Sequence, residues 1–479
     1  MVYHYLRHKN DIDEPTASLE EFPLVTVQLP IYNEMYVVRR LIEASCGMEY
    51  PKDKLEIQVL DDSTDETVDI VEHIVKEMRA RGNNIHHVRR GSRAGFKAGA
   101  LKEGLMKSSG EFVAIFDADF VPKKEFLLKT LPFFYSDNKV GMVQTRWEHL
   151  NADYSLLTRT QAMALDGHFV IEQTIRNKAG FFINFNGTGG IWRKACILDA
   201  GNWQSDTLTE DLDLSYRAQL RGWKFKFLKN ITSPAELPSE INALKSQQFR
   251  WTKGAIETAR KMLPKVWKSE LPFRMKLHST FHLTNNIVFP FILVAGVLNI
   301  PLMFIKHNGG YESYFEMMSI FVFAFIGSFL FYMYSQKDVY SDWRRRLFLF
   351  PLFMAGSMGF AVNNSKAVIE GLFKRKSEFV RTPKYSIKEK QDSWLDKKYV
   401  PVKFSWVVVV EIILAVYCLF GVVSSLYYLE IAAVPFQLLF FMGFSFVSYL
   451  SIQQALQARK IRLAQMNAQL EVQSDPVVA

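Results

Sequence analysis

The chain has 479 residues, a formal net charge of +9 and a hydrophobic fraction of 49%. This length predicts about two or three domains. Cys46, Cys196 and Cys418 lie far apart without CxxC spacing, which argues against a cysteine-bound zinc and against a disulfide framework. Much of the basic excess flanks hydrophobic stretches, so it indicates positions beside a membrane rather than a nucleic-acid partner.

The first 21 residues form an N-terminal segment without a signal peptide. The stretch MVYHYLRHKN at Met1–Asn10 has no apolar core long enough for a cleaved leader. It resembles the end of a membrane helix, so we expect that the natural protein begins earlier than this sequence.

Strand and helix patterns then alternate over about a hundred residues. The predicted elements are the strand Leu24–Pro30, helix Arg39–Ser45, strand Leu55–Leu60, helix Glu66–Arg81, strand Ile85–Val88, helix Lys97–Lys107 and strand Phe112–Phe116. Such alternation predicts an α/β domain, here residues 22–238, with a mostly parallel, Rossmann-like sheet covered on both faces. Ligands of such sheets bind beyond the carboxyl ends of the strands.

Residues 239–280 predict helices at a membrane interface. Asn242–Leu263 mixes basic and apolar residues, which is typical of an amphipathic helix on a membrane surface. An ordinary surface helix is the alternative.

Long uncharged stretches follow and predict an all-α transmembrane region at residues 281–452, because a bilayer core needs about 20 apolar residues per helix. The candidate spans are Phe281–Ile305, Met317–Tyr334, Leu347–Ile369, Phe404–Leu429 and Ile431–Ile452. Leu347–Ile369 fits least well, since it contains Pro351, Gly356, Gly359 and the polar run 363–366. The tail, residues 453–479, reads as helical and then disordered.

Two carboxylates follow a predicted strand at Asp117 and Asp119. In an extended segment, residues i and i+2 point to the same side. Two carboxylates that face one site favour a hard divalent cation such as Mg²⁺ or Mn²⁺, which also binds phosphate oxygens. A surface turn is the alternative for such a triplet.

Three further polar clusters occur along the chain. Asp61–Asp65 follows the second strand. In Thr209-Glu210-Asp211, the last carboxylate could act as a general base, and helix capping is the alternative. In Gln247-Gln248-Phe249-Arg250-Trp251, an Arg could hold a diphosphate and an indole face could stack on a sugar, whereas amphipathic packing is the alternative.

The order of these clusters, D, DxD, TED and QxxRW, resembles the processive branch of family 2 glycosyltransferases, which includes cellulose, hyaluronan and chitin synthases and cellulose-synthase-like proteins. FVRTPK at Phe379–Lys384 resembles the gating loop of that family, FxVTxK, with Arg381 where Val is usual. The likeness covers about Phe22–Tyr449. It implies a GT-A-like catalytic domain joined to the transmembrane region.

The resemblance also implies roles for individual residues. Pro30, Tyr32, Asn33 and Glu34 would form the base pocket, Asp61 would contact the base or ribose, and Lys97 would lie near the diphosphate. Asp117 and Asp119 would bind the metal and diphosphate, and Asp211 would be the catalytic base. Gln247, Arg250 and Trp251 would contact the donor diphosphate and the acceptor sugar. Gly187, Thr188 and Glu210, with Trp251, would lie on the acceptor side. Phe379, Arg381, Thr382 and Lys384 would form the gating loop. Asn186 stands where relatives often carry Cys.

The implied activity is that of a membrane-bound inverting hexosyltransferase that elongates a β-linked glucan or mannan from a donor of the UDP-glucose or GDP-mannose type. One alternative is a single transfer to a lipid, as in a ceramide glucosyltransferase. Another is a non-enzymatic scaffold or transport subunit. Expected partners are the donor, the growing polysaccharide, membrane lipid and accessory export subunits. We expect a cytosolic catalytic domain on a bacterial inner membrane or a Golgi membrane.

The basic segments Arg344–Arg346 and Lys374–Lys403 both read as cytosolic. Only Leu347–Ile369 separates them. We therefore expect that this stretch lies at the interface or enters and returns as a broken helix, so that the chain crosses four times with both termini in the cytosol.

Overall fold

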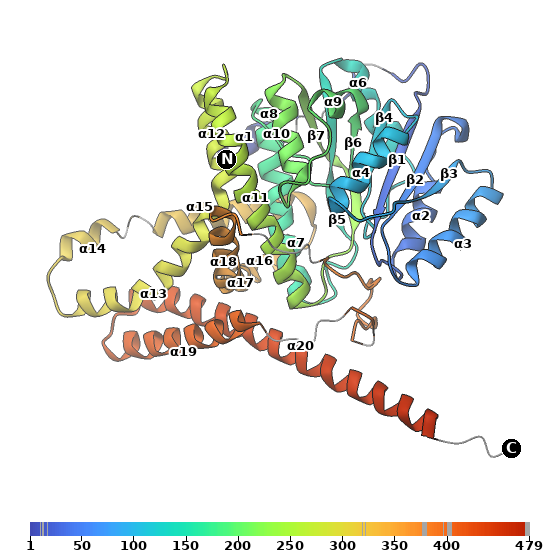
Figure 1. Cartoon of the computed structure of the whole chain (residues 1–479). Helices are drawn as coiled ribbons and strands as arrows, with labels where there is room; N and C mark the ends of the chain where they lie inside the picture. The colour runs from blue at the N-terminus through green and yellow to red at the C-terminus, as the bar shows by residue number, and fades with distance from the viewer. Residues whose placement is uncertain are drawn as a thin grey trace.

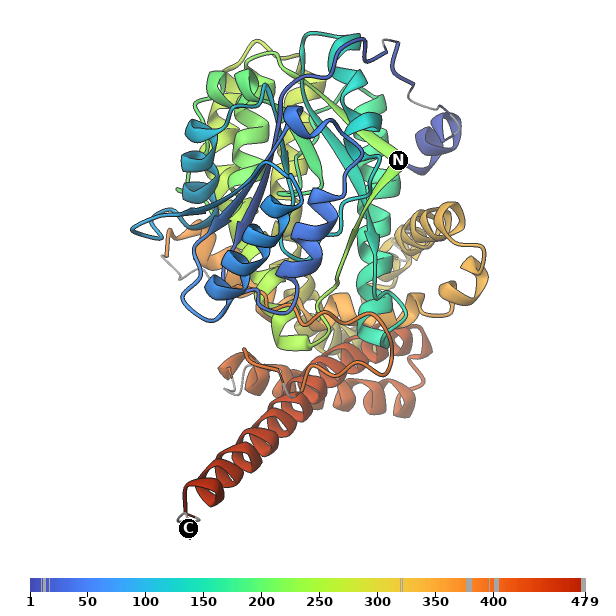
Figure 2. The same ribbon diagram turned by 90° about the vertical axis from the view of Figure 1, so that its right-hand side faces the viewer.

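The computed structural model describes residues 1–9, 11, 14–16, 18–318, 320, 322–375, 381–395, 397–399 and 405–474. An α/β domain occupies one side of the molecule, and the long helices α19 and α20 lie below it in Figure 1. The C-terminal part of α20 projects away from both in Figures 1 and 2.

The α/β domain is built on one seven-stranded sheet. Its strands are β1 (Val25–Ile31), β2 (Leu55–Asp61), β3 (Ile85–Arg89), β4 (Phe112–Ile115), β5 (Val140–His149), β6 (Gly190–Arg193) and β7 (Lys224–Ala235). The strand order is β3-β2-β1-β4-β6-β5-β7, with β6 antiparallel to both of its neighbours and the other pairs parallel. The mostly parallel sheet predicted from the alternating pattern is therefore confirmed.

Helices cover both faces of this sheet. Their bounds are α2 (Val38–Cys46), α3 (Thr67–Ala80), α4 (Phe96–Lys107), α5 (Phe126–Thr130), α6 (Pro132–Ser136), α7 (Leu156–Asp166), α8 (Thr174–Lys178), α9 (Lys194–Asp199) and α10 (Glu210–Leu220). Side chains of α2, α3, α5 and α6 fill one core, and side chains of α4, α9 and α10 fill the other. The seven elements predicted over residues 24–116 are each present with bounds within one residue.

Helix α11 (Ile241–Lys268) carries the QxxRW sequence and leaves the α/β domain. Its residues Ala255, Ala259, Met262 and Val266 are buried against α10 and α12 (Phe273–Thr284). The other side of α11 packs on α18 (Ala361–Leu372). The apolar residues of α11 are thus buried between two parts of the protein, and a place for this helix at a membrane surface stays a prediction.

Three helices among the described residues are long and apolar enough to cross a membrane, namely Phe273–His307, Trp406–Tyr427 and Ile431–Ala464. They contain α13 (Val288–His307), α19 (Trp406–Tyr427) and most of α20 (Val434–Ser474). The predicted span Met317–Tyr334 is not one of them. Its described residues belong to α14 (Glu312–Met318) and α15 (Val322–Val339).

The stretch Leu347–Ile369 is broken, as predicted. It comprises the end of α16 (Trp343–Leu347), α17 (Phe350–Gly359) and most of α18. Pro351 lies in the first turn of α17, and the second break follows Gly359. A Cβ on Gly359 would lie 2.4 Å from the carbonyl oxygen of Gly443, so the glycine allows close contact with α20. Asn363 and Asn364 are buried in protein.

Candidate active site

One cleft at the carboxyl ends of β1, β2 and β4 collects the predicted residues, although these come from positions 30 to 384 of the chain. It is lined by Pro30, Tyr32, Glu34, Lys97, Asp117, Asp119, Gly187, Thr188, Glu210, Asp211, Gln247, Arg250, Trp251, Arg381, Thr382 and Lys384. Asn186 lines it as well. Phe379 lies outside the described residues. The position of the cleft is the one that a mostly parallel sheet provides for ligands.

Two described residues of the predicted site do not line the cleft. Asn33 contacts the loop after β2, where its Oδ1 accepts from the Thr64 amide at 2.9 Å. Asp61 is the other. Its carboxylate is fully buried, lies 2.8 Å from His87 Nε2 and accepts a hydrogen bond from the Ser63 amide. Asp62 lines the cleft in its place and is held by Arg90 through contacts of 2.7 and 2.5 Å. Sequence reasoning passed over Asp62, although it directly follows the residue that was chosen.

Arg93 and Trp147 also line the cleft without having been predicted. The Arg93 guanidinium lies 3.3 Å from the centroid of the Tyr32 ring. The Trp147 ring lies 6.4 Å from that of Trp251, centroid to centroid. A Trp at the end of a strand is a weak signal in a sequence, because most such residues pack in a core.

Asp117 and Asp119 are both paired with lysines. Lys97 Nζ donates to Asp117 Oδ1 at 2.5 Å and to the Gly187 carbonyl oxygen at 2.9 Å. Lys384 Nζ lies 2.6 Å from Asp119 Oδ2. Burial raises the pKa of Asp117, and the ammonium of Lys97 opposes this rise.

The two carboxylates fit a divalent cation in donor chemistry, since Mg²⁺ and Mn²⁺ take oxygen ligands and often complete their shell with phosphates and water. The residues that the structure describes include no group of three or more His, Cys, Asp or Glu side chains that could hold an ion by themselves. An ion held here would therefore depend on a bound diphosphate for its remaining ligands.

Glu210 and Asp211 lie in the first turn of α10, and helix α11 holds the loop before them. The Leu208 amide donates to Glu257 Oε2 at 2.9 Å, and the hydroxyls of Thr209 and Thr258 are 3.1 Å apart. A Cβ on Gly254 would lie 2.6 Å from Thr209 Cγ2, so the glycine permits this contact. Thr209 makes no side-chain capping bond to α10, which removes one support for the capping interpretation.

The Asp211 carboxylate lies deep in the cleft, beside the backbone of Gly187. Gly187 has φ +80°, and a Cβ there would lie 3.0 Å from Asp211 Oδ2, so a larger residue would be both strained and crowded. Burial, together with the neighbouring Glu210, raises the pKa of Asp211 to about 7. A carboxylate with such a pKa is suited to accept a proton near neutral pH.

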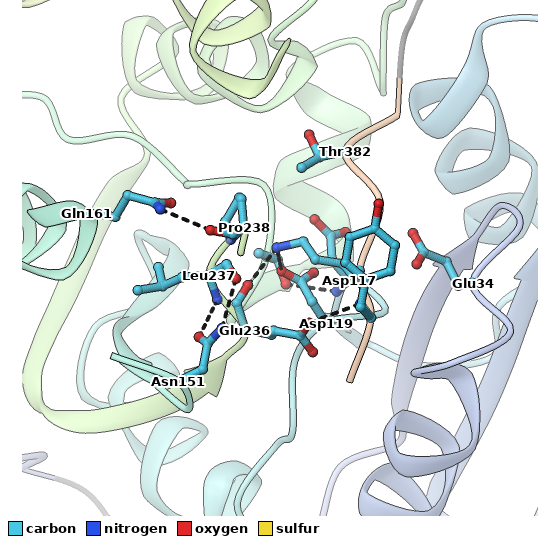
Figure 3. Close-up of polar contacts among 12 residues, drawn as sticks. Glu34, Asp117, Asp119, Asn151, Gln161, Glu236, Leu237, Pro238 and Thr382 are labelled. Carbon is cyan, nitrogen blue, oxygen red and sulfur yellow. Dashed lines mark hydrogen bonds and ion pairs between the residues drawn. The ribbon is translucent and has the colours of Figure 1, made fainter. Parts of the chain in front are cut away.

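The segment 381–387, called the strap below, passes between Glu34 and the Asp117–Asp119 pair in the view of Figure 3. Its Thr382 hydroxyl accepts from Arg250 Nη2 at 3.0 Å. Its Lys384 Nζ donates to the Glu236 carbonyl oxygen at 2.6 Å in addition to its contact with Asp119. The strap therefore connects the aspartate pair with the QxxRW helix.

Comparison with known proteins agrees with this geometry. Residues 23–254 match the family described as "Glycosyltransferase like family 2". "Probable glucomannan 4-beta-mannosyltransferase 4" of Oryza sativa subsp. japonica is 44% identical over 281 residues, 58% of this chain and 51% of the relative. "Glucomannan 4-beta-mannosyltransferase 2" of Arabidopsis thaliana is 45% identical over 262 residues, 54% of this chain and 49% of the relative. The chain thus spans about half the length of these curated relatives.

Among solved structures, the mannosyltransferase PcManGT from Pyrobaculum calidifontis, determined with GDP-mannose and Mn²⁺, aligns with a TM-score of 0.54. It is 17% identical, and the alignment covers 78% of this chain and 94% of that one. At this identity the likeness shows the fold, which is GT-A-like. Residues 23–254 are therefore a family 2 glycosyltransferase domain of the cellulose-synthase-like type.

Proposed function

We propose that this protein is an inverting hexosyltransferase that elongates a β-linked polysaccharide, of the mannan or glucan type, from a nucleotide-diphosphate sugar. One observation carries the proposal: the DxD pair, the TED carboxylate, the QxxRW side chains and the strap meet in a single cleft. The relatives support it by their names, which describe transfer of mannose into glucomannan in 4-β linkage.

In this reaction the acceptor hydroxyl attacks the anomeric carbon of the donor while the bond to the diphosphate breaks. Asp211 accepts the proton of that hydroxyl, and displacement from the opposite face inverts the anomeric centre. Arg250 and Lys97 lie where they can neutralise the charge that develops on the leaving diphosphate. Trp251 offers an aromatic face to the acceptor sugar.

Asp117 and Asp119 would hold Mg²⁺ or Mn²⁺ in this scheme, with Asp119 the more direct ligand. When bound, the cation neutralises the diphosphate and makes it a better leaving group. Lys97 and Lys384, which pair with the two carboxylates, would move their contacts toward phosphate oxygens as the donor enters. Asp119→Ala is accordingly expected to weaken donor binding and to abolish its dependence on the metal.

We further propose that the protein is embedded in a membrane through its long apolar helices, with the cleft on the cytosolic side. The membrane would be a bacterial inner membrane or a Golgi membrane. Lipid, the growing polysaccharide and accessory export subunits would then be its partners.

The test is turnover of purified protein with labelled GDP-mannose and UDP-glucose, with Mg²⁺, Mn²⁺ or EDTA, followed by linkage and size analysis. We expect a metal-dependent β-linked polymer in the wild type and none in Asp119→Ala. A product with a single sugar on a lipid would instead support the alternative function, transfer to a lipid acceptor, and would contradict polymer synthesis. No release of nucleotide diphosphate from either donor would contradict the proposal, and turnover that EDTA does not affect would contradict the metal.

A further inference from the structure

Arg381 of the strap occupies the position at which the loop that it resembles usually carries Val. Its Nε lies 3.2 Å from Glu34 Oε1, and its Nη1 donates to the Tyr32 carbonyl oxygen at 3.0 Å. Only 13% of its side chain is exposed. Arg381 therefore points into the end of the cleft formed by the segment after β1, whereas Lys384 of the same strap reaches Asp119.

Glu34 has capacity for a further hydrogen bond at this end of the cleft. Its side chain is 10% exposed and lines the cleft, and its Oε2 has no hydrogen-bond partner among the residues that the structure describes. Burial raises the pKa of Glu34 to about 8, and the Arg381 guanidinium opposes that rise, so N–H donors from a ligand would favour the ionised carboxylate over the protonated form. A buried carboxylate oxygen without a donor is costly, so a ligand that brings N–H groups would stabilise this arrangement.

The surroundings of the Glu34–Arg381 pair suit a planar ring. Pro30, Ile31 and Leu60 line the cleft at the ends of β1 and β2, and Pro30 lies opposite Leu60 in the sheet register. Arg93 stacks on Tyr32 beside them. This end of the cleft thus combines apolar walls and a flat guanidinium–phenol stack with one carboxylate and one further guanidinium.

We propose that Arg381 and Glu34 form a nucleobase-reading pair that selects a guanine nucleotide over a uracil nucleotide. The inference rests on the proposed function, because it names the donor class of the same cleft. Guanine presents two neighbouring N–H donors, which one carboxylate can accept together, and two acceptors that suit a guanidinium. Uracil presents a single N–H between two carbonyl oxygens and therefore makes one hydrogen bond fewer to Glu34.

The same contacts couple base recognition to the strap. Arg381 is followed directly by Thr382, which accepts from Arg250, and shortly by Lys384, which contacts Asp119. A guanine base that engages Arg381 would hold the strap over the diphosphate. Loss of Arg381 is therefore expected to raise the KM for the donor more than it lowers kcat.

The test is calorimetric binding of GDP and UDP to wild type, Arg381→Val, Arg381→Lys and Glu34→Gln. Lys388→Ala is the matched control, because Lys388 is an exposed cation just beyond the strap that does not line the cleft. We expect wild type to bind GDP about tenfold more tightly than UDP. Arg381→Val and Glu34→Gln should each remove most of that preference, Arg381→Lys should restore part of it, and the control should retain it.

The outcomes separate the inference from the proposed function. Binding of both nucleotides with equal affinity in wild type, or an equal loss of GDP and UDP binding in Arg381→Val, would overturn base reading while leaving a nucleotide-sugar enzyme in place. Failure of wild type to bind either nucleotide would overturn both. Thermal midpoints of all variants, measured beside the binding, show whether each protein is folded.

Discussion

At the scale of single residues, the position of Asp211 leads to a test of its role as base. Its carboxylate approaches the Gly187 backbone inside the cleft, where an acceptor hydroxyl would lie. Asp211→Asn keeps the shape but cannot accept a proton. We expect turnover to fall by about 10²–10⁴-fold with nearly unchanged nucleotide binding. Asp206→Asn, a half-exposed carboxylate nearby, is the control. Turnover at the wild-type level in Asp211→Asn would remove the assignment.

The raised pKa of Asp211 leads to a second residue-scale prediction. Burial and the neighbouring Glu210 raise this pKa to about 7, and the base acts only when it is ionised. The value of kcat/KM should therefore rise with pH through about 7 and level off above about 8. Initial rates from pH 5.5 to 8.5 measure this profile. A rate that stays constant or falls across this range would show that no carboxyl group with a raised pKa limits the reaction.

Residue types at the site could be predicted from the sequence, but which of two adjacent carboxylates faces the cleft could not. The carboxyl ends of parallel strands share one edge, so acidic residues that follow β2 and β4 had to lie near one another. Asp61 and Asp62 point to opposite sides, and the choice between them depends on His87 and Arg90 from a distant part of the chain. The direction in which Arg381 points could not be predicted for the same reason, because its partner Glu34 lies far away in the sequence.

At the scale of helices and strands, the periodicity of the sequence predicts where each element lies along the chain, but not which other elements it packs against. The first seven elements have clear patterns, and most of them are flanked by Pro, Gly or Asp. The insertion of β6 between β4 and β5 in antiparallel orientation depends on pairing across long stretches of chain, which no local pattern records. For α11 the pattern showed an apolar face, but it could not show that α10 and α12 cover this face.

A buried ion pair and a hydrogen bond connect helix α11 to helices α19 and α20. Lys245 Nζ donates to Glu411 Oε2 of α19 at 2.7 Å and to Ser451 Oγ of α20 at 2.9 Å. The side chains are 9% and 0% exposed. Lys245 precedes Gln247, Arg250 and Trp251 on the same helix. This contact therefore helps to set the position of the QxxRW side chains relative to the α/β domain.

Loss of one partner should destabilise the protein, because it leaves the other charge buried. We expect Glu411→Leu or Lys245→Met to lower the free energy of unfolding by about 3–5 kcal/mol. The double variant should recover much of this loss. Thermal unfolding in detergent is the measurement, and Lys306→Met in the more exposed Lys306–Glu430 pair is the control, with an effect below about 1 kcal/mol. Additive losses in the double variant would show that the pair does not act as a unit.

At the scale of the whole molecule, the contacts limit how the chain can cross a membrane. The ends of α13 and α19 meet at the Lys306–Glu430 ion pair. The other end of α19 contacts α11 through Glu411, and the middle of α20 contacts α11 through Gln454, which accepts from the Ile241 amide. Helix α13 therefore leads away from the α/β domain, α19 leads away again, and α20 returns. Two helices that lead away from the α/β domain require two that lead back, and α20 is only one of these.

We infer that helix α15 is the second helix that leads back to the α/β domain. Its 18 residues are about 27 Å long. Near its end, Gln336 donates to Asp166, and Asp338 accepts from Tyr5 and pairs with Lys229, so this end contacts the α/β domain. The broken α17 and α18 then stay on that side, where α18 packs on α11. The expected topology is four crossings, with α13 and α19 leading out and α15 and α20 leading back.

Cysteine labelling tests this topology in a variant whose Cys46, Cys196 and Cys418 are replaced by alanine. Single cysteines at Arg345 and Ser393 flank the broken helices and are exposed on the side of the α/β domain. Single cysteines at Asn308 and Tyr427 lie at the meeting point of α13 and α19. We expect an impermeant maleimide to label the first pair from one face of sealed vesicles and the second pair from the other. Labelling of Arg345→Cys and Ser393→Cys from opposite faces would mean that the broken segment crosses fully, and the strap could not then reach the cleft in the membrane-embedded protein.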